Sequence, residues 1–261
     1  MVFVFTSVNG VAAQLSQDAV RAFDDYVYGV EARLAKQHSS LQTFIAAPEN
    51  GRDNGPGARP QLNDIYIEKV NGGTWTAPGA LLHHWRAGTV VQKANASQML
   101  ALLRDFDGLP KRYAPQVAGS RVLSNNGQVA TIAVRLKEEH VVTIVLDAEY
   151  RVEAKLLGND RGYSISRSAH VWQIENPGTP QERRRPEGDD DGFLWRLNSY
   201  WSFARAGEGL RIECEAVSLT RDIPLGLGWL IAPLIADFPR DELEFTLRAT
   251  RNALAASVGQ E

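Results

Sequence analysis

The sequence is poor in cysteine and has no excess of charge of one sign. Its 261 residues include a single cysteine, Cys214, which excludes an intramolecular disulfide and an all-cysteine metal site. The 28 lysine and arginine residues are balanced by 31 aspartate and glutamate residues, which gives a net charge of −3. Because proteins that bind phosphate backbones usually carry a basic excess, this composition argues against nucleic acid as the main partner.

Long hydrophobic runs and catalytic motifs are also missing. The longest apolar stretch, IPLGLGWLIAPLIADFP at 223–239, is interrupted by prolines and glycines. It is shorter than the ~20 residues of a transmembrane helix. The sequence contains no GxSxG, P-loop or GxGxxG motif. His83 and His84 are adjacent in an expected strand, so their side chains point to opposite faces and do not favour one shared metal ion. We predict no metal site and no cofactor.

The N-terminal stretch MVFVFTSVNGVAAQ is apolar and ends in the small residues Val11-Ala12-Ala13, which are typical before a signal-peptidase cut. It lacks the basic start of a complete signal peptide. We interpret residues 1–13 as a truncated signal peptide, which predicts a periplasmic or secreted protein. A hydrophobic tail or short edge strand in a cytoplasmic protein is the alternative interpretation.

The next part of the chain, residues 14–79, is predicted to form a helical arm, a loop and a short strand. Apolar residues at three- and four-residue spacing predict an amphipathic helix over 17–37, with Ser16 as its N-cap. The segment 48–60 has the glycine- and proline-rich composition of a loop, and 63–70 reads as a strand. The apolar stripe of the helix needs a surface, so we expect it to pack on the main domain.

The main domain is predicted over residues 80–261. A strand over 83–92 precedes a helix whose start carries Asn95 and Gln98 as a capping-box pair. Two-residue alternation then predicts six antiparallel strands, over 117–123, 128–137, 141–156, 162–175, 193–203 and 210–220.

The chain closes with a helix predicted over 240–256, with Pro239 at its first position. Its expected buried stripe is formed by Leu243, Leu247, Thr250 and Leu254.

This order of elements resembles the START-like, or helix-grip, superfamily, which includes lipid-transfer domains, polyketide cyclases and aromatases, and plant pathogenesis-related proteins. The resemblance covers residues 80–256. The stretches HHWRAGTVV, GFLWRLNSYWSF and PRDELEFTLRATRNAL are also similar to uncharacterised bacterial members. The resemblance implies an α+β fold in which a curved antiparallel β-sheet wraps around a long C-terminal helix and leaves a cavity, here with an N-terminal helical extension.

For function, the resemblance implies non-enzymatic binding or transport of a hydrophobic small molecule or lipid in that cavity. A cyclase-, aromatase- or hydrolase-like enzyme using the same cavity is the alternative, with Tyr150, Arg167 and His170 as its polar groups. A protein-interaction module is a third hypothesis. The superfamily has no shared catalytic signature, so the resemblance informs the fold more than the reaction.

The strand GFLWRLNSYWSF supplies most of the candidate ligand contacts. Alternation places every second residue of this strand on one face. The strand is predicted to pair with the strand over 210–220, with Phe203 opposite Leu210. The predicted cavity wall from this strand consists of Trp195, Leu197, Ser199 and Trp201. A sealed apolar core is the alternative for the two tryptophans.

Arg167 is the candidate polar anchor for a ligand. A two-residue loop at Asn159-Asp160 would pair Val152 with Arg167, which would place the arginine on the inward face together with Tyr150. A charge in an apolar cavity is costly unless it is paired. Three alternatives stay open: a structural ion pair, a side chain that reaches solvent, and a register slip that turns Arg167 outward.

The opposite face of the last two strands is polar, with Arg196, Asn198, Tyr200, Glu213 and Glu215. This cluster is predicted to form either an exposed ladder or the docking surface of the N-terminal arm.

Overall fold

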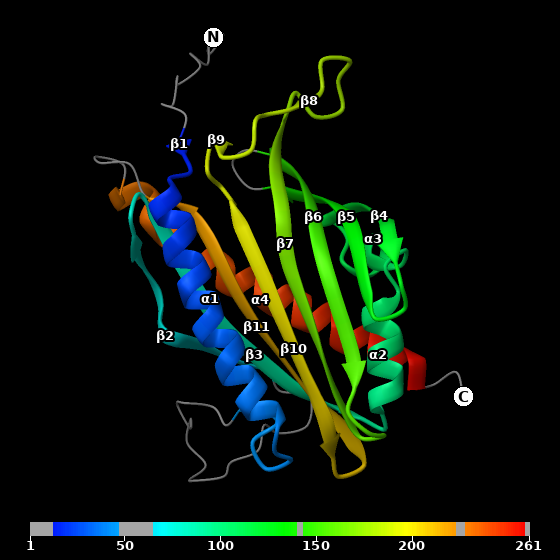
Figure 1. Ribbon diagram of the computed structural model, residues 1–261. Coiled ribbons are helices and arrows are strands. Elements are labelled where there is room, and N and C mark those ends of the chain that lie inside the picture. The colour runs from blue at the N-terminus through cyan, green and yellow to red at the C-terminus, as the bar shows by residue number, and fades with distance from the viewer. Residues whose placement is uncertain (1–12, 47–64, 140–142, 223–227, 259–261) are drawn as a thin grey trace.

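The computed structural model describes residues 13–46, 65–139, 143–222 and 228–258 (Figure 1). In chain order the elements are β1 (Ala13–Gln14), α1 (Gln17–His38), β2 (Tyr66–Ala77), β3 (Ala80–Gln92), α2 (Ala96–Arg104), α3 (Leu109–Arg112), β4 (Val117–Asn125), β5 (Val129–Glu139), β6 (Thr143–Leu156), β7 (Arg161–Glu175), β8 (Arg183–Arg184), β9 (Asp189–Asp190), β10 (Arg196–Ala206), β11 (Gly209–Arg221) and α4 (Gly228–Val258).

A curved antiparallel sheet with the order β2-β3-β11-β10-β7-β6-β5-β4 forms the middle layer, and β8 pairs with β7. Figure 1 shows α4 running across one face of this sheet and α1 across the opposite face. We call these the inner face and the outer face. The predicted α+β helix-grip fold is confirmed.

The helix α1 forms as its sequence predicts. The Oγ of Ser16 accepts a hydrogen bond from the amide of Ala19 at 3.0 Å, which satisfies one of the free donors at the helix start. Its buried stripe packs on apolar residues of the outer face. The members of this stripe are Ala19, Phe23, Val30 and Leu34, and they meet Leu82, Tyr200, Val217 and Leu219.

The strand β2 belongs to the main sheet, so the predicted domain boundary between residues 79 and 80 is wrong. Residues 66–77 pair with β3, and Ala77 lies opposite Ala80 across a tight turn. Gly79 adopts φ +71° in that turn, a conformation that glycine adopts at little cost. The turn therefore joins two hydrogen-bonded strands and separates no domains.

The helix α4 begins at Gly228, earlier than the predicted start at residue 240. Pro239 is therefore inside the helix, and its prediction as the first helical position is wrong. Proline removes one backbone hydrogen bond, and tertiary packing commonly overrides such a local preference. The predicted stripe of Leu243, Leu247, Thr250 and Leu254 is buried, which confirms the face that α4 turns toward the protein.

The turn between β10 and β11 is shorter than predicted. It consists of Gly207 and Glu208, with Gly207 at φ +62°, and it places Phe203 opposite Ile212 instead of Leu210. The register thus differs from the prediction by two residues. Because side chains alternate with a period of two, every residue of β10 stays on its predicted face.

The predicted signal peptide, residues 1–13, lies outside the described residues except for Ala13, which pairs with Asp190 of β9. In the described part of the chain, no helix combines the length and the apolar character that crossing a bilayer requires.

Candidate functional site

The centre of the inner face carries small hydroxyl side chains where neighbouring strands carry large apolar ones. Cα pairing places Ser199 opposite Ser166, Trp201 opposite Ser164, and Tyr150 opposite Ser168. We call Ser164, Ser166, Ser168 and Ser199 the serine patch. The patch lies on the face whose apolar residues pack in the two inner core clusters, so it places hydroxyls within an otherwise apolar layer.

Most hydroxyls of this wall lack a hydrogen-bond partner among the residues that the structure describes. The Oγ of Ser168 accepts a bond from the amide of Leu197 at 2.9 Å. Among the described residues, the hydroxyls of Tyr150 and Ser164 have no hydrogen-bond partner, although the two residues are only 7% and 3% exposed. Burial raises the pKa of Tyr150, so its hydroxyl stays protonated and remains a donor. A ligand oxygen that bonds to the Tyr150 hydroxyl would gain about 0.5–1.5 kcal/mol, the net worth of a typical hydrogen bond.

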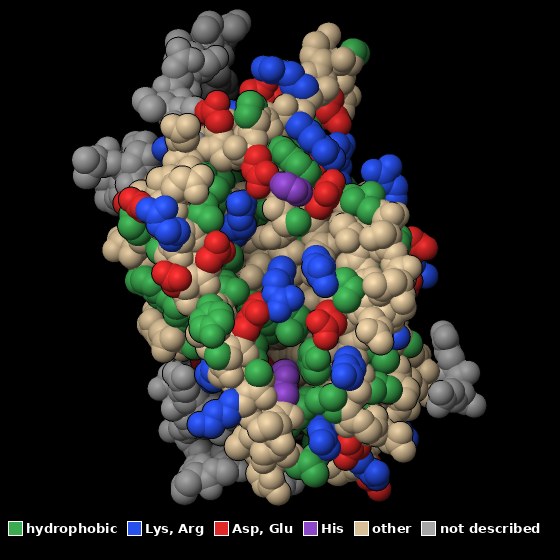
Figure 2. Space-filling model, viewed as in Figure 1, with side chains coloured by type: hydrophobic (Ala, Val, Ile, Leu, Met, Phe, Trp, Pro, Cys, Tyr) green, Lys and Arg blue, Asp and Glu red, His purple; other side chains and the backbone are tan. Residues whose placement is uncertain are grey.

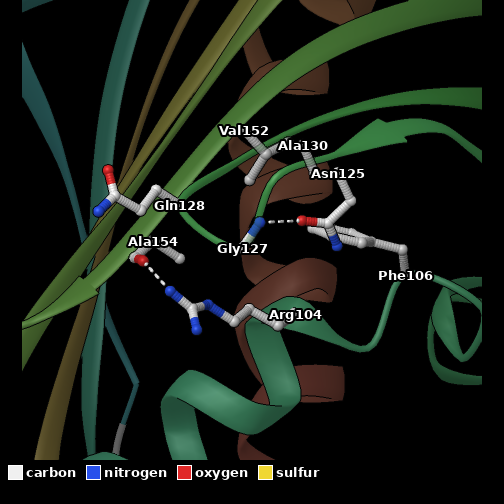
Figure 3. A pocket seen from close by; sticks show the side chains of 8 residues that line it. All are labelled: Arg104, Phe106, Asn125, Gly127, Gln128, Ala130, Val152 and Ala154. Atoms are coloured by element: carbon white, nitrogen blue, oxygen red, sulfur yellow. Dashed lines mark hydrogen bonds between the residues drawn. The ribbon is translucent and has the colours of Figure 1, made fainter.

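Figure 3 shows a pocket of the inner face, which has a volume of about 110 Å³. Its lining comprises Arg104, Phe106, Asn125, Gly127, Gln128, Ala130, Val152 and Ala154. The strand partners of Ser166 and Ser164 are Val152 and Ala154, so pocket and patch adjoin.

Arg104 closes one side of this pocket. Its Nη2 donates to the carbonyl oxygen of Ala154 at 2.6 Å, as Figure 3 shows. The volume is below the roughly 300 Å³ at which sites for drug-sized ligands begin. The pocket therefore has room for a small group or for one end of a longer molecule.

The two tryptophans of GFLWRLNSYWSF do not share a wall. Trp201 lies on the inner face, in the core that packs against α4. Trp195 precedes β10, packs with α1 on the outer side and donates from Nε1 to Oδ1 of Asp190 at 3.0 Å. The prediction of Trp195 as part of a cavity wall is wrong, because strand alternation does not extend beyond Arg196 at the start of β10.

Arg167 points to the outer face, so its prediction as an inward anchor is wrong. A bulge at Ala169 lets Tyr150 pair with Ser168, which shifts the part of β7 before Ala169 by one residue from the predicted register and exchanges the two faces of that part. The Nε and Nη2 of Arg167 donate to the two carboxylate oxygens of Glu31 in α1, at 2.6 and 2.8 Å. Two of the alternatives are observed together: a one-residue shift in register turns Arg167 outward, and there it forms a structural ion pair.

His170 is also on the outer surface, with its Nδ1 2.8 Å from Oε2 of Glu187. Tyr150, Arg167 and His170 therefore do not converge on one site. Of the predicted ligand contacts, Tyr150, Leu197, Ser199 and Trp201 lie on the inner face, and their contact with a ligand stays a prediction.

Sequence-based reasoning misses three serines of β7, although their signal is visible. Ser164, Ser166 and Ser168 alternate in the segment YSISRS, which shows that they share a face. A regular strand would place that face outward, and only the bulge turns it inward.

The polar residues of the outer face dock the N-terminal arm, one of the two predicted alternatives. Arg33 of α1 pairs with Glu215, and Oε2 of Glu215 is also 2.9 Å from Nε2 of His84. The Nδ1 of His84 is 2.7 Å from the hydroxyl of Tyr26, another α1 residue. Burial alone would raise the pKa of Glu215, but the bond to His84 and the charge of Arg33 outweigh it and hold that pKa at about 2.

Glu213 lies on the same face but is less well compensated. Burial raises its pKa from 4.5 to about 7, although the hydroxyl of Tyr66 donates to its Oε2 at 2.6 Å. Its other oxygen is buried and has no hydrogen-bond partner in the part of the chain that the structure describes. In the described ranges, no three His, Cys, Asp or Glu side chains are close enough to hold a metal ion.

Comparison with known proteins returns structural neighbours of low identity. No family model and no curated protein matches the chain. A protein from Thermus thermophilus is 18% identical over 66% of this chain and 97% of its own, with a TM-score of 0.44. A STAR-related lipid transfer protein from Xanthomonas axonopodis is 17% identical over 75% and 99%, with a TM-score of 0.43. The Zhui aromatase/cyclase from a Streptomyces species is 12% identical over 69% and 94%, with a TM-score of 0.44. The helix-grip assignment of this chain rests on its own strand order and helix placement.

Proposed function

We propose that the protein binds a hydrophobic small molecule or lipid between the inner face of the sheet and the helices α2 and α4, without catalysing a reaction. The observation that carries this proposal is that the buried residues Tyr150 and Ser164 have hydroxyls without a hydrogen-bond partner among the described residues, beside a pocket in an otherwise apolar wall. Such hydroxyls give an apolar site its few directional contacts.

The wall favours a ligand whose polar group is uncharged. The inner-face residues around the patch are apolar or hydroxylated, and include Val152, Leu197 and Trp201. A charged group placed among them would lose its hydration without gaining an ion pair. A molecule with an apolar body and one hydroxyl or carbonyl oxygen fits this chemistry, with that oxygen at the Tyr150 hydroxyl.

The enzymatic alternative has no supporting constellation among the described residues. General acid–base chemistry needs its groups within hydrogen-bond reach of one substrate. Arg167 and His170 are on the outer face, each paired with a glutamate. Tyr150 is left as a single candidate group on the inner face, and one hydroxyl does not indicate a type of reaction.

Binding can be tested with 1-decanol as the neutral probe and decanoate as its charged counterpart. We expect 1-decanol to bind saturably and more tightly than decanoate in isothermal titration calorimetry. Tyr150→Phe is expected to weaken 1-decanol binding by roughly three- to tenfold, the worth of one hydrogen bond. Ser164→Leu, which replaces a small hydroxyl side chain with a larger apolar one, is expected to weaken 1-decanol binding.

Tyr163→Phe is the matched control. Tyr163 belongs to β7 but faces outward, where its hydroxyl donates to Glu153 at 3.1 Å. Native mass spectrometry of the purified protein gives a second readout, through copurified apolar molecules. The absence of saturable binding to either probe, or equal losses in Tyr150→Phe and Tyr163→Phe, would contradict the proposal.

We further propose that the protein is exported, on the strength of the small residues Val11-Ala12-Ala13 after an apolar stretch. N-terminal sequencing of the protein from its native cell is expected to find a chain that starts near Gln14. A chain that retains Met1 would contradict export.

A further inference from the structure

A second pocket lies on the outer face, on the opposite side of the sheet from the serine patch. It has a volume of about 430 Å³ and opens between the start of α1, the bulge of β7 and the segment that carries β9. Its lining comprises Gln14, Leu15, Gln17, Val20, Ala169, His170, Glu187, Gly188, Asp189 and Arg196. Figure 2 shows basic, acidic and histidine side chains gathered over these elements.

One carboxylate holds two nitrogen donors in this pocket. The Oε1 of Glu187 accepts from Nη1 of Arg196 at 3.0 Å, and its Oε2 is 2.8 Å from Nδ1 of His170. The imidazole of His170 is also stacked on Trp172, with ring centroids 5.1 Å apart. Both side chains are therefore fixed before any ligand arrives, which lowers the entropic cost of binding.

The guanidinium of Arg196 and the imidazole of His170 each keep hydrogen-bonding nitrogens that no described residue contacts. Within the described ranges, Arg196 donates from Nη1 alone, to Glu187 and to the carbonyl oxygen of Trp195 at 2.7 Å. Its Nε and Nη2 remain, and these two parallel donors match the two oxygens of a carboxylate. The Nε2 of His170 is likewise without a partner among the described residues.

We propose that this pocket binds a small organic monocarboxylate. The carboxylate would receive two hydrogen bonds from Nε and Nη2 of Arg196, with Nε2 of His170 as a further contact. The compact apolar part of the ligand would lie against Leu15, Val20 and Ala169, which form the apolar part of the lining.

Charge and size favour a single carboxylate over a phosphate. The carboxylate of Glu187 offsets the positive charge of Arg196, and Asp189 adds a further negative charge to the lining. A dianion would meet more repulsion there than a monoanion. The volume is within the roughly 300–1,000 Å³ of small-molecule sites, so it also accommodates an apolar body that inorganic phosphate lacks.

The proposal is tested by titrating the full chain with benzoate, benzamide and inorganic phosphate in calorimetry. Benzoate is expected to bind, and benzamide and phosphate each at least roughly tenfold more weakly, because neither offers a monoanionic carboxylate. Arg196→Gln is expected to weaken benzoate roughly tenfold. Arg196→Lys is expected to weaken benzoate binding similarly, since lysine keeps the charge but lacks two parallel N–H donors.

Arg205→Gln is the matched control, because Arg205 is an exposed arginine of the same strand whose Nε donates to the carbonyl oxygen of Gly207. Ala169→Leu fills the pocket from an exposed position and is expected to abolish benzoate binding even if the Arg196 variants are unstable. Equal affinity for benzoate and benzamide, phosphate binding as tight as benzoate, or unchanged binding in Ala169→Leu would overturn the proposal. The inner-face proposal would stand in each of these cases, because 1-decanol probes the other side of the sheet.

Discussion

Replacing Glu215 with glutamine is expected to lower the free energy of unfolding by about 3 kcal/mol at pH 7, the typical cost of removing one partner from a buried ion pair. Glu215 is 1% exposed, and its carboxylate forms ion pairs with Arg33 and His84. The Nη1 of Arg86 also lies 3.6 Å from its Oε1. Removing the negative charge leaves Arg86 and His84 buried with fewer compensating contacts, whereas the partly exposed Arg33 can turn to solvent. Urea unfolding followed by tryptophan fluorescence measures the change.

The loss should depend on pH in a defined direction. The pKa of Glu215 is about 2 in the folded protein and near 4.5 in the unfolded chain. Its stabilising contribution is therefore fully present above pH 4.5 and disappears as the pH falls toward 2. The difference between wild type and Glu215→Gln is expected to shrink over that interval.

Glu208→Gln is the control for this series. Glu208 is exposed in the turn before β11, and the same substitution there is expected to change stability by less than about 0.5 kcal/mol. Similar losses in both variants would show that the network around Glu215 does not stabilise the fold.

Replacing Glu213 with glutamine is expected to have the opposite effect, stabilising the protein by about 3 kcal/mol at pH 8. The folded protein holds the proton of Glu213 up to about pH 7, whereas the unfolded chain releases it near 4.5. Wild type therefore loses stability as the pH rises between these values. Glutamine cannot ionise, and its carbonyl oxygen can still accept the hydrogen bond from Tyr66.

The measurement is urea unfolding at several pH values between 4 and 8. Wild type and Glu213→Gln should have similar stability at pH 4 and diverge as the pH rises, with Glu208→Gln following wild type. Parallel curves for wild type and Glu213→Gln over the whole range would rule out a buried, late-titrating carboxyl at this position.

The sequence predicted most of the fold because local patterns specify it. The capping residues Ser16 and Asn95 start the helices that they are expected to start, and the capping box of Asn95 and Gln98 is present. Alternation in β10 survives a two-residue error in register, since such an error moves residues along the strand without turning them over.

The candidate site was predicted less completely, because it depends on where one strand is irregular. The bulge at Ala169 shifts the part of β7 before Ala169 by one residue, which brings Ser164 and Ser166 to the inner face and carries Arg167 out. Nothing in the local sequence distinguishes a bulged from a regular strand here. Tyr150, Leu197, Ser199 and Trp201 keep their predicted face because their strands are regular around those positions.

By itself, the sequence determined the element types, the α+β fold with a terminal helix packed on one face of the sheet, and the polar and apolar faces of most strands, because these follow from periodicity over a few neighbouring residues. Only the tertiary structure decided the partners of the charged residues. Arg167 meets a glutamate 136 positions away, and Glu215 meets an arginine 182 positions away. Such pairs form only after α1 docks on the sheet, and no local pattern encodes which distant side chains that docking brings together.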